Sequence, residues 1–222
     1  MNKEWSELNK TMQSQIKKKD TYSEGISTLF ELRNSIMQTI NSFRNDLSRD
    51  DFNAIPFVNA EGYHNKTIAY SLWHVFRIED IVAHTLINGD DQIFYSGNYK
   101  ERIKSPIITT GNELVKKDIS DFSMQLDINE LYSYIRDVKE NTETILRKLP
   151  YEMLKQKISV QRREVLLDLN VVSNAENALW LVDYWCTKDI RGLIQMPFSR
   201  HWIMHIEASL RIKNKIQKSS GF

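Results

Sequence analysis

The chain has 222 residues, enough for one sizeable domain with a full apolar core or for two small ones. Its 7 glycines and 4 prolines make up about 5% of the residues, against roughly 12% in average proteins. Sheets need many tight turns and nucleotide-binding folds need glycine-rich loops, so this composition favours an all-α fold. The formal net charge of +1 excludes a general electrostatic affinity for nucleic acid or anionic membranes.

Cysteine content and hydropathy indicate the compartment. The single cysteine, Cys186, permits no intramolecular disulfide and no site built from several cysteines, which suits a reducing environment. The first ten residues contain no apolar run, and no stretch reaches the roughly 18 apolar residues of a membrane span. We therefore predict a soluble cytoplasmic protein with no membrane partner.

Two helices are predicted in the first 47 residues. Apolar side chains recur at helical spacing over residues 2–19, which predicts a short N-terminal extension helix within residues 1–20. Residues 21–47 carry an apolar stripe about seven turns long, which is typical of a helix that packs in a bundle. We call it the first bundle helix.

The second bundle helix is predicted over residues 66–88. It is apolar on most of its circumference, and Asn88 and Gly89 are typical of a helix end. Residues 90–126 show little periodicity, so we expect a long connection with some short helix in it. Because neighbouring antiparallel helices need only short loops, this length indicates a crossover that returns the chain to the same end of the bundle.

The second half of the chain predicts three further helical segments. A third bundle helix is expected over residues 127–149, where Pro150 ends it. Residues 151–172 fit a strand, an irregular loop or a helix, and the sequence leaves this open. Ser173 and Glu176 form a capping-box pattern that predicts a helix from 173 to about 193, and Pro197 suits the first turn of the last bundle helix. We expect one domain over residues 1–222.

Three of the five histidines form a candidate metal site. His201 and His205 lie four residues apart, so on a helix their imidazoles stack on one face and can hold one ion. His74 lies inside the apolar second helix, where a ring that loses hydration needs another group to satisfy it. It is the natural third ligand, although a hydrogen-bonded core histidine is the alternative. For His64, in a loop, and His84, near a helix end, we expect a solvated or capping role.

Side chains near these histidines suggest a cavity. Arg77 follows His74 by about one turn and is a candidate for binding an anionic substrate, with a surface salt bridge to Asp80 or Glu79 as the alternative. Ala208 and Ser209 leave room beside the imidazoles or allow close helix packing.

Aromatic and polar residues near this site have further interpretations. Tyr70 and Ser71 are candidate hydrogen-bond partners of the ligands. Trp180, Tyr184 and Trp185 are expected in the core, as most aromatic side chains on a helix are.

The histidine within SLWHVFRIEDIVAH, the long crossover and the terminal RHWIMHIEASLRIKNK resemble the DinB/YfiT-like superfamily of metal-dependent proteins. The resemblance extends from about residue 24 onward. It implies a four-helix bundle with up-down-down-up topology, and a divalent metal ion, such as zinc, nickel or iron, held by His74, His201 and His205. Residues 1–20 and 151–195 exceed what a minimal member needs, so they are expected to decorate the bundle or to form an oligomer contact.

The resemblance also implies a chemistry. Three neutral imidazoles leave the ion its double charge and an open position, where a small thiol can bind and ionise. Similar proteins are thiol-dependent S-transferases or isomerases, so the expected partners are a small-molecule thiol and an electrophile. The same site could instead hydrolyse a substrate through bound hydroxide.

Two other kinds of function stay open. One is a noncatalytic stress-response or interaction protein whose metal only ties helices together. The other is a DNA-associated damage-response factor, which the near-neutral charge and the absence of a recognisable reading helix count against. A homodimer is a general expectation for compact bundles.

Overall fold

The computed structural model describes residues 2–219, and over this range the chain is all-α, as expected. Residues 1 and 220–222, which the predicted domain 1–222 includes, lie outside the described residues. No β-strand occurs in residues 2–219, where Lys157 and Asp189 form an isolated bridge. The α-helices are α1 (Lys3–Gln15), α2 (Tyr22–Asp46), α3 (Ile68–Asp80), α4 (Ile93–Ser96), α5 (Tyr99–Ile103), α6 (Lys117–Gln125), α7 (Ile128–Lys148), α8 (Val160–Asp168), α9 (Glu176–Cys186), α10 (Ile190–Gln195) and α11 (His201–Ser219).

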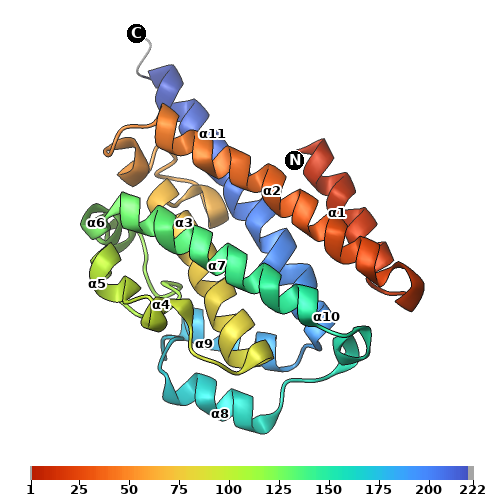
Figure 1. The fold of residues 1–222 in the computed structure, drawn as a ribbon. Helices are drawn as coiled ribbons and strands as arrows, with labels where there is room; N and C mark the ends of the chain where they lie inside the picture. Colours follow the sequence, from red (N-terminus) through yellow and green to blue (C-terminus); the bar gives the residue numbers. More distant parts are fainter. Residues whose placement is uncertain (1, 220–222) are drawn as a thin grey trace.

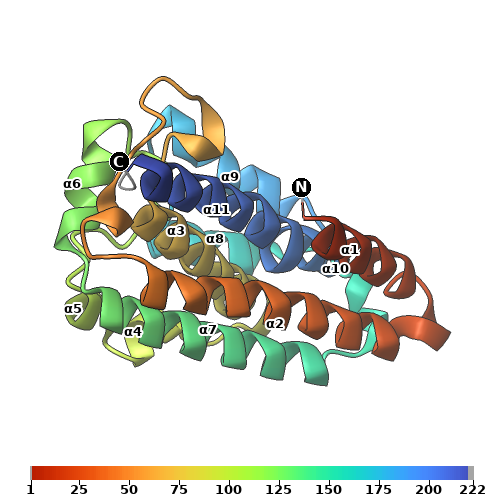
Figure 2. The ribbon, with the colours of Figure 1, turned by 90° about the horizontal axis from the view of Figure 1, so that it is seen from above.

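Helices α2, α3, α7 and α11 form the centre of the fold. Helix α3 packs against both α7 and α11, and α2 contacts the same two helices from the other side. Helices α2 and α11 run in one direction and α3 and α7 in the opposite one (Figures 1 and 2). Because α3 and α7 are parallel, the segment between them returns the chain to its starting end, and α4, α5 and α6 lie in it. Helix α1 packs along α2 as the predicted extension.

The ends of the second bundle helix follow from local chemistry. Thr67 precedes α3, and its hydroxyl accepts a hydrogen bond from the backbone N–H of Tyr70. After Asp80 the helix widens into a π-helical segment, Ile81–Asn88. Gly89 ends this segment with φ of 79°, a conformation that glycine adopts without a Cβ penalty. The predicted end at Asn88 and Gly89 is therefore confirmed.

The helix predicted over residues 173–193 is wrong in its extent. Ser173 forms no capping box with Glu176, because its hydroxyl accepts from the backbone of Ala175, and α9 begins only at Glu176. Helix α9 ends at Cys186, and the carboxylate of Asp189 then accepts from the N–H of Gly192 to start α10. A second N-cap thus divides one predicted helix into two.

Short helical segments resolve the parts that the sequence left open. Residues 151–172 contain a 3-10 segment, Tyr151–Lys155, and α8. Other 3-10 segments are Lys19–Thr21, Asp51–Asn53 and Gly62–His64, and Met196–Arg200 is a π-helical turn that leads into α11. None of the helices in residues 2–219 combines the length and apolar content of a membrane span.

A buried ion pair joins the four central helices. The guanidinium of Arg33, on α2, donates at 2.7 and 3.0 Å to the two carboxylate oxygens of Glu79, on α3, and at 3.1 Å to Glu143, on α7. The indole N–H of Trp202, on α11, donates at 2.7 Å to Glu79. Arg33 also lies over the Trp202 ring, 4.2 Å from its centroid. Each charge is therefore compensated inside the bundle.

Replacing Arg33 by Met should lower the free energy of unfolding by about 3–5 kcal/mol, because the buried Glu79 carboxylate loses its counter-ion. Urea denaturation measures this change. Lys10→Met, which removes an exposed ion pair with Glu7, is the control and should leave the urea midpoint unchanged. The double variant Arg33→Met/Glu79→Met should recover part of the loss, and equal midpoints for Arg33→Met and Lys10→Met would show that the network contributes nothing.

Candidate metal centre

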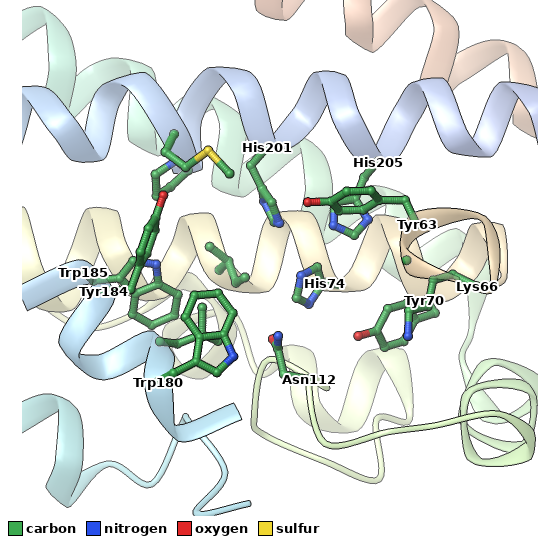
Figure 3. Close-up of a pocket in the computed structure, with 15 residues that line it drawn as sticks. Tyr63, Lys66, Tyr70, His74, Asn112, Trp180, Tyr184, Trp185, His201 and His205 are labelled. Carbon is green, nitrogen blue, oxygen red and sulfur yellow. The ribbon is translucent and has the colours of Figure 1, made fainter. Parts of the chain in front are cut away.

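Three histidines from two helices converge on one point. His74 lies in the middle of α3, and His201 and His205 occupy the first and second turns of α11. The ring centroids are 5.0 Å apart for His74 and His201, 4.8 Å for His74 and His205, and 4.6 Å for His201 and His205. One potential ligand atom from each residue lies within 4.8 Å of the others. We call these three residues the histidine triad (Figure 3).

The orientation of the His74 ring is set by its neighbours. Its Nδ1 lies 2.7 Å from the carbonyl oxygen of Thr110, and since a carbonyl only accepts, Nδ1 carries the proton. The lone pair is therefore on Nε2. The Tyr70 ring stacks on the imidazole with 5.5 Å between centroids and 10° between planes, and its hydroxyl donates to the carbonyl of Gly111 at 3.0 Å. The loop at residues 110–111 thus holds the ring from one side.

The triad is buried and electrically neutral. Burial lowers the pKa of His74 to about 4, and it lowers the pKa values of His201 and His205 well below the ordinary value. The Nδ1 atoms of His201 and His205 are buried without a hydrogen-bond partner. Neutral imidazoles with available lone pairs are the form that binds metal ions.

These observations fit a divalent metal ion. A buried ring nitrogen without a partner is costly, and coordination would compensate for its lost hydration. Three imidazoles from an HxxxH pair and a second helix form a three-protein-ligand set that leaves a further coordination position for water or substrate. The three buried histidines could therefore hold an ion between α3 and α11.

A cavity of about 320 Å³ lies over the triad, which is within the size range of small-molecule sites. Figure 3 shows the three rings in its middle, Tyr63, Lys66 and Tyr70 on one side, and Trp180, Tyr184 and Trp185 on the other. We call these the lysine end and the aromatic end. The lining residues are Gly62, Tyr63, Lys66, Tyr70, His74, Ile78, Asn112, Trp180, Leu181, Tyr184, Trp185, Met196, Pro197, His201 and His205.

Arg77 does not line this cavity, which corrects the prediction that it binds substrate there. It is fully buried, and its Nε donates to the carbonyl of Ile108 at 2.9 Å. Its guanidinium lies 3.4 Å from the Asp80 carboxylate and over the Phe94 ring. The alternative pairing with Asp80 is therefore found, but in the interior, because the crossover segment packs over this face of α3.

The other two histidines lie apart from the triad. His64 lies in the 3-10 segment Gly62–His64, and its Nε2 lies 2.8 Å from a guanidinium nitrogen of Arg211. His84 is only 2% exposed, so the solvated role, one of its two predicted alternatives, is wrong. Its Nδ1 bonds to the Asp90 carboxylate at 2.8 Å, and α8 packs over the π-helical segment that carries it.

The residues predicted near the triad have different outcomes: Ala208 and Ser209 fit the alternative of close helix packing, whereas Trp180 does not lie in the core. Ala208 and Ser209 are buried but do not line the cavity, and the hydroxyl of Ser209 donates to the carbonyl of His205. Trp180, expected in the core, is 52% exposed at the cavity, and the centroid of its ring lies 5.6 Å from that of Tyr184.

Sequence reasoning missed the role of Lys66 and Asn112. The i, i+4 spacing of Trp180 and Tyr184 was a usable signal for one shared face. Nothing local marked Lys66 or Asn112, because both lie in irregular segments.

Comparisons with known proteins bear on the fold. No model of a protein family matches the chain, and no curated protein matches it. A solved structure of a conserved protein from Enterococcus faecalis is similar, with a TM-score of 0.55 and 14% sequence identity over 87% of this chain and 95% of that chain. At this identity the similarity supports a shared fold and carries no function.

The metal content of the purified protein tests the triad. Elemental analysis should find about one divalent ion per chain, and His74→Ala/His201→Ala/His205→Ala should remove it because all three nitrogen ligands are lost. His64→Ala is the matched control, since that histidine lies outside the triad. Equal metal content in the triple variant and the parent would contradict the site.

Metal affinity should depend little on pH between 7 and 5. Protons compete for a ligand only below its pKa, which is about 4 for His74, whereas an imidazole with an ordinary pKa of about 6.5 is about 90% protonated at pH 5.5. Competition titration of zinc at several pH values measures this.

The same pKa difference affects folding. The unfolded chain takes up protons on His74 as the pH falls from about 6.5 to about 4 while the folded chain does not, so the metal-free protein loses stability over that interval. In the zinc titration, circular dichroism at each pH must therefore confirm that the metal-free protein stays folded. A steep loss of zinc affinity between pH 7 and 6 in folded protein would show that the histidines are not desolvated.

Proposed function

We propose that this protein is a divalent-metal-dependent, thiol-dependent S-transferase that acts on a small thiol and an electrophile. The observation that carries the proposal is the convergence of three neutral, buried imidazoles on an open cavity. A site meant only to tie two helices together has no need of such a cavity, whereas a catalytic site keeps a coordination position accessible to substrate.

The ion supplies one element of the chemistry when bound: with three neutral ligands it keeps its full double charge and lowers the pKa of a thiol that binds to it. Zinc, nickel and iron all suit imidazole ligands. The chain contributes the rest. Thr110 and Tyr70 hold the His74 ring, and the aromatic end of the cavity places an apolar wall beside the triad.

The proposed step is a substitution at carbon. The thiol loses its proton to solvent, and a sulfur lone pair forms a C–S bond with the electrophile. The leaving group departs as an anion with the electron pair of the bond that breaks, and the proton of the thiol stays in solvent, so an alkyl or aryl halide gives a thioether, a halide ion and a proton.

The side chains around the triad favour thiol transfer over hydrolysis. Hydrolysis by a metal site generally employs a nearby carboxylate as general base for the attacking water. Among the described residues that line the cavity, none is Asp or Glu. A thiol needs no such base once its pKa is lowered.

Thiol consumption by the metal-loaded protein tests the proposal. Incubation with cysteine, glutathione or coenzyme A and a panel of alkyl and aryl halides should consume thiol and electrophile in equal amounts. His201→Ala should lower the rate by at least about 100-fold, since loss of supporting contacts alone costs a metal site 10–100-fold. His64→Ala should keep the parental rate. Full metal content without thiol consumption across the panel would favour the noncatalytic helical bundle instead.

A further inference from the structure

The charge of the cavity is unbalanced. Lys66 is the one ammonium among its described lining residues, and no carboxylate lines it. Lys66 is half-buried and forms no ion pair within residues 2–219, and the face of the Tyr70 ring, with its centroid 5.2 Å from Nζ, is its observed partner. Burial without a counter-ion lowers the pKa of this ammonium group. A half-buried cation of this kind favours an anionic ligand.

Asn112 adds hydrogen-bond donors on one side of the triad. The side chain of Asn112 points toward it (Figure 3), and its Oδ1 already accepts from the Thr110 hydroxyl at 2.8 Å. The Asn112 amide N–H groups have no acceptor among the described residues, so they are available to a ligand oxygen. The cavity therefore offers donors and a positive charge to a ligand and presents no anionic acceptor.

The opposite end of the cavity is apolar and aromatic. Trp180 and Tyr184 lie edge to face with centroids 5.6 Å apart, and Leu181 and Met196 complete this wall. Such a wall binds a flat apolar group by stacking and burial. About half of the Trp180 surface is exposed, which leaves the ring accessible to an incoming ligand.

We propose that the cavity binds an aryl carboxylate, with the carboxylate paired to Lys66 and the aromatic ring against Trp180 and Tyr184. The triad lies between the two ends, so such a ligand spans the metal position (Figure 3). This inference deepens the proposed function because it assigns the acidic group of a substrate to the lysine end and its apolar part to the aromatic end. The binding measurement on metal-free protein needs no thiol. Carboxylate binding can therefore be absent in a protein that transfers thiols, and it can be present in a protein that does not.

Binding of 2-naphthoate to metal-free protein, measured by equilibrium dialysis, tests the inference, with uncharged 2-naphthalenemethanol as the matched ligand. The parent should prefer naphthoate. Lys66→Met should lower the affinity for naphthoate by about tenfold or more, as expected for the loss of a charge-assisted hydrogen bond. It should leave the affinity for the alcohol unchanged. Lys66→Arg should restore the preference, and Lys10→Met, on the exposed face of α1, should match the parent.

The aromatic end is tested separately. Trp180→Leu should weaken both ligands by a similar factor, because the wall stacks on the ring that they share. Three outcomes would overturn the proposal: equal affinity of the parent for the two ligands, no effect of Lys66→Met, or no binding at millimolar concentration. Binding of naphthoate only to zinc-loaded protein would also overturn it, because the carboxylate would then bind the ion and not Lys66.

Discussion

The buried pair of Arg33 and Glu79 is the constraint on which the arrangement of the helices depends. Glu79 receives hydrogen bonds from α2 through Arg33 and from α11 through Trp202, and Arg33 also reaches Glu143 on α7. Charges desolvated in this way tolerate little displacement, because each shift leaves one of them unpaired. The network therefore holds α3 and α11 in one relative position.

That position brings the triad together. Trp202 directly follows His201, and Glu79 lies five residues after His74, so the network and the triad occupy different faces of the same two helices. One face is turned to the bundle interior, where Arg33 compensates the charge. The other face carries the imidazoles. They are desolvated, and because no anionic group among the described residues pairs with a protonated imidazole there, they remain neutral. A rigid pair of helices thus presents a preorganised set of nitrogen ligands.

The segments beyond the four central helices turn this ligand set into a cavity. The loop at residues 110–112 orients His74 and supplies Asn112, and the segment before α3 supplies Lys66. Helix α9 adds an aromatic wall that the bundle alone lacks. Residues 151–195, expected from the resemblance as a decoration of the bundle, therefore contribute directly to the candidate site.

The sequence by itself determined the all-α class, the extents of α2 and α7 to within a few residues, and the three histidines that meet. These features depend on helical periodicity, caps and spacing, which are local. Tertiary structure alone decided that Arg77 and His84 are buried and that Lys66, Asn112 and Trp180 surround the triad. Those outcomes depend on which distant segment covers each helix face, and periodicity reports the existence of a face but not what packs against it.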